Sequence, residues 1–241
     1  MRTIRHPTAP RVRLVTGAAW QTPATVAGHP TAVAPSEPVG TAVAAVLTDF
    51  LAGKRAALAG MAPELLPVAD ELAALCATGP GPEAVAVATA WAAAPGSPGA
   101  EAETAVLRVA AAVDVLRVAE LAHREVMAAA GTRGVVVPDR VRVPLVAEDV
   151  VLGADAGILV GDLALVWSEE LLGGAGLSPS GLERVAGVWD AMRTALTARG
   201  YLQLLAAAGG TVGPDGAGPV GTAATGWARR LGAALAGTPT D

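Results

Sequence analysis

The chain has 241 residues, of which 52% are hydrophobic and only 16% are charged, and its net charge is −5. This length suits one domain with a sizeable core, and the negative charge gives no electrostatic basis for binding nucleic acid. Aromatic residues make up only 3% of the chain, so its apolar content is mostly Ala, Val and Leu. Because Ala and Leu have high helix propensities, this composition favours helices. Cys76 is the single cysteine, which excludes a disulfide framework and a cysteine metal cluster; we expect a small buried apolar residue.

A mean hydropathy of +0.48 raises the question of membrane-spanning segments. A spanning helix needs roughly 18 or more consecutive apolar residues, and the sequence contains no such run. Its two most apolar segments, 150–167 and 102–121, are both interrupted by charged side chains. We therefore expect buried helices in a soluble protein. The N-terminal arginines are not followed by an apolar segment, so no secretory signal is predicted and we expect a cytoplasmic location.

Residues 1–40 contain six prolines among Ala, Thr, Val and Gly, without a helical or strand period. This composition predicts a flexible tail ahead of a domain that covers residues 41–241. The tail is either an extension without function or an arm for interaction or targeting. Trp20 lies in it, outside any apolar stripe, and is the aromatic residue we would test as an interaction anchor.

From Thr41 onward, apolar residues recur every three or four positions, which predicts a first helix. We expect it to end near Lys54 and Arg55, because cations suit the C-terminal end of the helix dipole. Further helices are predicted between glycine and proline breakers, at 63–77, 83–94, 101–130, 147–173, 178–208 and 219–236. The valine-rich segments 135–137 and 141–146 are short and bounded by proline, and we interpret them as a connecting loop. Seven helices with little strand material predict an all-α fold.

Four segments carry a family resemblance. They are Glu120–Met127, Thr132–Gly134, Ile158–Leu172 with its Gly161-Asp162-Leu163, and Val188–Thr194. In order and spacing they resemble the trans-polyprenyl diphosphate synthases, above all actinobacterial ones. That family typically reads His-Asp-Asp-Val-Met-Asp, then Thr-Arg-Arg-Gly, a Gly-Asp-Leu helix and Trp-Asp-x-Met-Arg-Thr. The similarity covers about residues 41–241 and implies an isoprenoid-synthase-type helical bundle.

The resemblance also implies a chemistry. Carboxylates at positions i, i+1 and i+4 of one helix point the same way and hold Mg²⁺, which binds the diphosphate of an allylic substrate. A second aspartate-rich helix supplies the remaining metal ligands, and a basic segment binds the phosphates.

The present chain departs from this pattern at the positions that carry chemistry. Arg124 and Glu125 replace the first two aspartates, and Ala128 replaces the third. An arginine brings a fixed positive charge where the ion would bind, which disfavours Mg²⁺. The basic segment falls on residues 79–85, where every cation is lost, and the Lys-Thr-Ala motif falls on 221–223 without its lysine. Of the Gly-Gln-Tyr-x-Asp motif only Tyr201 remains.

The chain also stops before the family's second aspartate-rich helix, so we expect a bundle that is truncated before its last helices. The losses affect substrate-contacting positions, whereas scaffold features such as Trp167 and Trp189 are kept. We therefore predict no catalytic residue, no metal ligand and no cofactor, with Mg²⁺ needed only if the chain is an enzyme after all. A fold that is retained without its metal-binding and phosphate-binding residues suggests a function other than catalysis.

Several polar residues remain open to two interpretations. Arg124, Glu125 and Arg133 are the candidates for a vestigial diphosphate slot, because arginines can bind a diphosphate without metal. The alternative, which we favour, is that Arg124 and Glu125 form salt bridges or face water. For His123 we expect a packed, hydrogen-bonded side chain, and for Asp162 a polar contact between helices.

Three functional hypotheses follow. The favoured one is a non-catalytic subunit that pairs with an active prenyl diphosphate synthase and stabilises it or tunes its product length; a homodimer is the other expected assembly. The second is residual prenyltransferase or terpene synthase activity on allylic diphosphates, using Glu125, Arg133 and Asp162. The third is a protein that binds an isoprenoid ligand in its apolar bundle.

Overall fold

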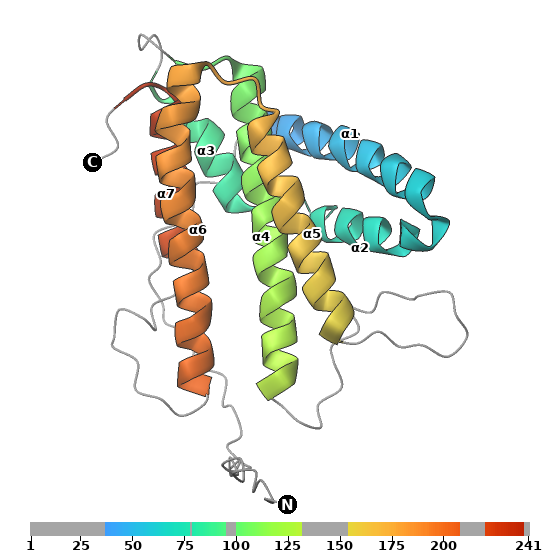
Figure 1. Cartoon of the computed structure of the whole chain (residues 1–241). Coiled ribbons are helices and arrows are strands. Elements are labelled where there is room, and N and C mark those ends of the chain that lie inside the picture. Colours follow the sequence, from blue (N-terminus) through green and yellow to red (C-terminus); the bar gives the residue numbers. More distant parts are fainter. Residues whose placement is uncertain (1–36, 78, 95–99, 132–153, 208–219, 239–241) are drawn as a thin grey trace, which may run out of the picture. The chain divides into compact units, whose positions relative to one another are not determined.

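A computed structural model describes residues 37–77, 79–94, 100–131, 154–207 and 220–238. These residues belong to one of the two units into which the chain divides, residues 35–241. Every regular element in the described ranges is helical, which confirms the all-α prediction (Figure 1). The elements are α1 (Glu37–Met61), the short 3₁₀ helix η1 (Pro63–Leu65), α2 (Leu66–Cys76), α3 (Pro82–Ala92), α4 (Glu103–Gly131), α5 (Ala154–Gly173), α6 (Pro179–Ala207) and α7 (Val220–Leu235).

Two expectations fall outside the described residues. Most of the predicted tail, including Trp20, lies in residues 1–36, and the predicted loop lies in residues 132–153. Helix α1 begins at Glu37, four residues before the predicted start at Thr41. The flexibility of the tail and the domain boundary at residue 40 stay predictions.

The prediction that the first helix ends near Lys54 and Arg55 is wrong, because α1 continues to Met61. The residues that follow the two cations are rich in alanine, which sustains the helix. The two cations instead form ion pairs with carboxylates of neighbouring helices. Lys54 pairs with Glu170 of α5, and Arg55 Nε lies 2.6 Å from Asp70 Oδ1 of α2.

Helix α4 is the centre of the packing. Nearly all of its residues from Ala105 to Ala119 are buried, and most of them are alanine or valine. Small side chains let neighbouring helices approach closely. Helix α5 packs along α4, α3 packs against both α4 and α7, and α1 and α2 form a hairpin beside α4 (Figure 1). In this arrangement α4 and α6 run in the same direction, whereas α5 and α7 run in the opposite direction.

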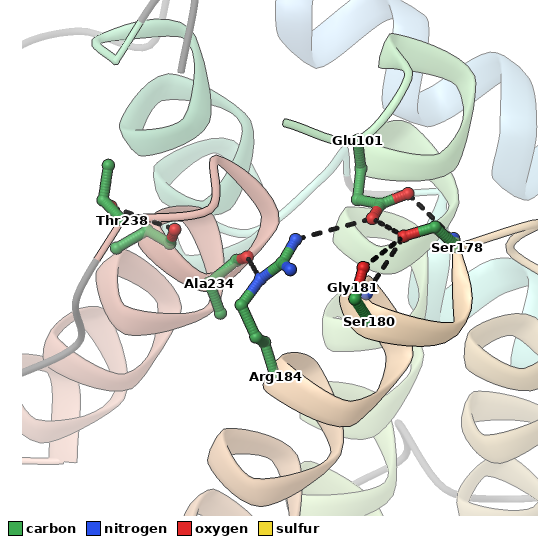
Figure 2. Close-up of polar contacts among 8 residues, drawn as sticks. Glu101, Ser178, Ser180, Gly181, Arg184, Ala234 and Thr238 are labelled. Atoms are coloured by element: carbon green, nitrogen blue, oxygen red, sulfur yellow. Dashed lines mark hydrogen bonds and ion pairs between the residues drawn. The ribbon is translucent and has the colours of Figure 1, made fainter. Parts of the chain in front are cut away.

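A buried carboxylate joins three helix ends (Figure 2). Glu101, just before α4, accepts hydrogen bonds from the backbone N–H of Ser178 at 3.0 Å and from its hydroxyl at 2.5 Å. Ser178 in turn caps α6, since its Oγ accepts the N–H of Gly181 at 3.0 Å. Arg184 Nη2 lies 3.5 Å from Glu101, and its Nε donates to the carbonyl of Ala234 in α7 at 2.8 Å. These contacts fix the starts of α4 and α6 to the end of α7.

In the part of the chain that the structure describes, none of the helices combines the length and the apolarity needed to cross a membrane.

Candidate functional site

Two cavities lie along α4 and α6 and share four lining residues, Leu116, Glu120, Arg124 and Leu196. We call them together the α4–α6 groove. The larger part, about 480 Å³, is also lined by α5 and reaches Tyr201 near the end of α6. The smaller part, about 290 Å³, reaches the start of α3. The groove is mostly apolar with a few charged side chains, which is the usual character of a ligand-binding site.

Arg124 lies in this groove, at the position where the resemblance expects the first metal-binding aspartate. Its Nη2 atom lies 3.6 Å from Glu120 Oε1, one helical turn earlier on α4. An (i, i+4) pair of opposite charges is favourable on a helix surface. The favoured interpretation of Arg124 as an ion-paired residue agrees with this contact.

Arg193 of α6 lines the larger part of the groove and is also paired. Its Nη1 atom lies 2.6 Å from Glu169 Oε1 of α5. The same oxygen accepts the indole N–H of the buried Trp189 at 2.9 Å. Glu169 therefore ties α5 to α6 and neutralises the arginine.

Arg117 lines the smaller part of the groove. Its Nε donates at 2.9 Å to Oδ1 of Asp114, a carboxylate with no exposed surface. The same oxygen accepts the backbone N–H of Gly81 at 2.8 Å, at the start of α3. A Cβ atom at Gly81 would lie 2.6 Å from Arg117 Nε, so only glycine leaves room for this arginine.

Some polar atoms at this end of the groove are buried and have no hydrogen-bond partner among the described residues. They include Glu83 Oε2, Asp114 Oδ2 and Arg117 Nη2. Glu83 and Arg117 both line the smaller cavity. Because leaving a buried polar atom unpaired costs about 1–3 kcal/mol, such a group needs an explanation.

His123 packs between α4 and α5 as expected. Its Nε2 atom lies 3.1 Å from Asp162 Oδ1, and its ring occupies the space where a side chain at position 161 would stand. Gly161 therefore allows the two helices to approach, and Asp162 is the polar contact between them. Both side chains contribute to this packing, and His123 also lines the larger part of the groove.

The structure describes only part of the predicted diphosphate slot. Arg124 is in the groove, whereas the side chain of Glu125 and all of Arg133 lie outside the described residues. The described residues do not fit a magnesium ion here, because a guanidinium stands where a carboxylate is expected. Nor do the described residues contain a group of three or more His, Cys, Asp or Glu that could hold a metal.

Three residues of this site, Arg117, Asp114 and Glu83, were not predicted from the sequence. A signal for the first two was present, since they are charged residues three positions apart in an otherwise apolar stretch of helix. Burying a charge is costly unless it is paired, so such a pair marks either a structural or a functional contact. Glu83 gives no comparable signal, because an acidic residue in the first turn of a helix is common.

Cys76 is buried near this cluster, as predicted. Burial raises the pKa of its thiol to about 12, and the negative charge of Asp114 acts in the same direction. The thiol is therefore a packed, unreactive group.

A further cavity of about 480 Å³ lies beside α1 and the end of α5. Two of its charged side chains have clear structural partners: Glu170 pairs with Lys54, and Arg108 Nη1 donates to the carbonyl of Gly174 at 3.1 Å. The second contact satisfies a carbonyl at the end of α5, so we assign these residues to the fold.

The solved structures that share this architecture include two from Corynebacterium glutamicum. Geranylgeranyl pyrophosphate synthase from Corynebacterium glutamicum, complexed with isoprenyl diphosphate and magnesium, matches with a TM-score of 0.67 and 23% identity over 84% of this chain. A second crystal structure of a geranylgeranyl pyrophosphate synthase from the same organism matches with a TM-score of 0.61 and 22% identity, again over 84% of this chain. The present chain spans 61% and 56% of the lengths of these two proteins.

This likeness shows that the chain has the helical fold of the geranylgeranyl pyrophosphate synthases, which confirms the predicted isoprenoid-synthase-type bundle. No model of a known protein family matches the sequence, and no curated protein matches it.

Proposed function

We propose that this chain is a non-catalytic relative of the polyprenyl diphosphate synthases, and that it pairs with an active prenyl diphosphate synthase. One observation carries the proposal: among the described residues, each of the three arginines that line the α4–α6 groove is paired with a carboxylate of this chain. The pairs are Arg117 with Asp114, Arg124 with Glu120, and Arg193 with Glu169.

Paired arginines are poor ligands for a diphosphate. Such a substrate carries several negative charges, and it binds well where cations are free to neutralise them. Here the diphosphate would have to displace a carboxylate from each arginine. It would also meet Glu83, which lines the smaller cavity. With the three paired carboxylates, this makes four carboxylates against three arginines.

Association is supported by apolar side chains on α5. Leu159 is 63% exposed and Val166 is 61% exposed, although both are large apolar residues. They are seven positions apart, so they lie on one face of the helix, two turns from each other. The exposed Asp162 lies between them on the same face, so this surface combines two apolar side chains with one carboxylate. Exposed apolar side chains next to polar ones are typical of interaction surfaces. In the proposed assembly this face of α5 contacts the partner synthase and stabilises it or adjusts its product length.

The test is co-expression of the full chain with a prenyl diphosphate synthase from the same organism, followed by affinity purification and identification of the bound subunit by mass spectrometry. We expect the synthase to co-purify in a stoichiometric complex. The double variant Leu159→Glu with Val166→Glu should abolish it, because two carboxylates would be buried without partners. Met61→Glu, at an exposed residue of α1, is the matched control and should leave it intact.

A chain that stays monomeric and binds no synthase would contradict the proposal. A complex that survives the double variant would contradict the assignment of the surface to α5.

A second function, binding of an isoprenoid, is favoured by the groove itself. Its larger part combines about 480 Å³ of volume with apolar side chains such as Leu116, Ile158 and Leu196. A linear hydrocarbon chain fits such a surface without help from metal. Thermal stabilisation of the protein by isoprenoids in the absence of Mg²⁺ would support this function.

A further inference from the structure

A carboxylate lies in the middle of the exposed apolar face of α5. Asp162 follows Leu159 by three positions and precedes Val166 by four, so the three side chains lie on one face of the helix. The side chain of Asp162 is 60% exposed, and Leu159 and Val166 are exposed to a similar degree. A negative charge is thus present where the proposed function places the contact with the synthase.

Asp162 is held in position by the neighbouring helix. His123 of α4 has its Nε2 atom 3.1 Å from Asp162 Oδ1. Because an ionised carboxylate only accepts hydrogen bonds, Nε2 carries a proton and donates. The imidazole ring is itself confined, since it occupies the space that a side chain at Gly161 would need. The orientation of the carboxylate is therefore set before a partner binds, which lowers the entropic cost of binding.

The second oxygen of this carboxylate is available. Among the described residues, Asp162 Oδ2 has no hydrogen-bond partner, and no arginine or lysine pairs with Asp162. A neutral imidazole satisfies one oxygen and leaves the negative charge in place. Burial of an ionised carboxylate in an apolar interface is unfavourable unless a cation pairs with it. A partner that covers this face of α5 therefore needs a cation opposite Asp162.

We propose that this face of α5 binds an apolar surface of the synthase that carries one arginine or lysine at its centre, and that this cation pairs with Asp162 Oδ2. Leu159 and Val166 pack on apolar side chains on either side of the cation. The carboxylate selects the partner, because a surface without the cation leaves Asp162 buried and unpaired, and an acidic surface is repelled. This inference rests on the proposed pairing with a synthase and names the chemistry of the partner's surface.

The experiment measures, by surface plasmon resonance at low and at high NaCl concentration, the binding of the full-length chain to the synthase that co-purifies with it. Salt screens the attraction between charges, so we expect the wild-type complex to weaken as salt is added. Asp162→Asn keeps the shape of the side chain and removes its charge. It should weaken binding about tenfold at low salt and reduce the salt dependence. Asp162→Arg should abolish binding, because it places two cations together.

His123 acts through Asp162 as a positioning residue, and it is tested separately. His123→Leu removes the hydrogen-bond donor but leaves the charge of Asp162. We expect binding to weaken about threefold, through the lost orientation of the carboxylate, with the salt dependence of the wild type. Loss of the salt dependence in His123→Leu would contradict the positioning role.

Glu183 of α6 provides the matched controls, because it is an exposed carboxylate on another helix. Glu183→Gln and Glu183→Arg change the charge as the Asp162 variants do, and both should keep the wild-type affinity and salt dependence. Circular dichroism of every variant, recorded before the binding measurement, checks that its helices are intact.

Unchanged affinity in both Asp162 variants would overturn the inference and leave the pairing with a synthase in place. Equal weakening by the Asp162 and Glu183 variants would also overturn it, because the effect would then follow the net charge of the chain. If no synthase co-purifies with the wild-type chain, the inference and the proposed pairing both fail.

Discussion

Gly181 has no side chain in the space that the carboxylate of Glu101 occupies (Figure 2). A methyl group there would push against Glu101 and disturb its hydrogen bonds to Ser178. We predict that Gly181→Ala lowers the free energy of unfolding by about 1–3 kcal/mol, as overpacking of a buried contact does. Urea denaturation followed by circular dichroism measures this change.

Gly187 provides the matched control on the same helix, since a Cβ atom there would meet nothing within 4 Å. Gly187→Ala should leave stability unchanged or raise it by about 0.5–1 kcal/mol, because alanine is the better helix former. Equal stability of the two variants would show that the Glu101 network does not constrain the helix ends.

Cys76 gives a residue-scale prediction that depends on pH. Its folded-state pKa is raised from 9.0 to about 12 by burial, with a further contribution from Asp114. In the unfolded chain the thiol ionises above about pH 9, while in the folded protein it stays protonated, so unfolding is increasingly favoured between these values. The free energy of unfolding should therefore fall as the pH rises from about 9 towards 12, and this part of the fall should disappear in Cys76→Ala.

The same residue can be checked with a thiol reagent, because it is the only cysteine of the chain. At mildly alkaline pH we expect no reaction in native buffer and one equivalent of reaction in denaturant. Rapid stoichiometric labelling of the native protein would mean that the thiol is not buried.

The polar contacts of the groove could be predicted only in part. The pairing of Arg124 with Glu120 follows from their spacing on one helix, and the structure has this contact. The pairing of Arg193 with Glu169 joins residues 24 positions apart on two helices, so it depends on how those helices pack. The same holds for Glu83, which reaches the groove only because α3 starts beside α4. Spacing along one helix predicts pairs within that helix. Contacts between helices can be located only when the fold is known.

The positions of most helices were predictable, because glycine or proline residues lie at most of the helix ends. The predicted start at Pro63 corresponds to η1, and the predicted helix at Glu83 begins one residue earlier, at Pro82. The end of the first helix was not predictable from Lys54 and Arg55, because their charges are used in pairs with Glu170 and Asp70 of other helices. Alanine-rich continuation outweighed the weak dipole preference.

Helices α3 and α7 give a prediction about close packing. A Cβ atom at Gly232 of α7 would lie 2.6 Å from the Cβ of Ala90 and 3.0 Å from the backbone nitrogen of Trp91. Because backbone atoms cannot move aside cheaply, Gly232→Ala should separate the two helices and destabilise the protein by about 1–3 kcal/mol. Thermal unfolding by calorimetry measures the loss.

Gly226, also on α7, serves as the control, because a Cβ atom at this position would meet nothing within 4 Å. Gly226→Ala should match or exceed the stability of the wild type. If Gly232→Ala is equally well tolerated, the contact between α3 and α7 is looser than described.

At the scale of the whole molecule, a synthase fold is combined with a groove whose arginines are occupied by the chain's own carboxylates. In the proposed function these cations stabilise the fold instead of a bound diphosphate. The scaffold can then serve association through the exposed face of α5, which carries Leu159 and Val166. The small share of charged residues, 16% of the chain, agrees with a protein in which few charges remain for substrate.

A turnover assay of the purified full-length chain tests the proposed absence of catalysis most directly. Geranyl or farnesyl diphosphate is supplied with isopentenyl diphosphate and Mg²⁺, and products are detected by mass spectrometry. We expect no product above a control without protein. Magnesium-dependent formation of a longer or cyclised isoprenoid would contradict it and would favour the alternative in which Glu125, Arg133 and Asp162 support catalysis.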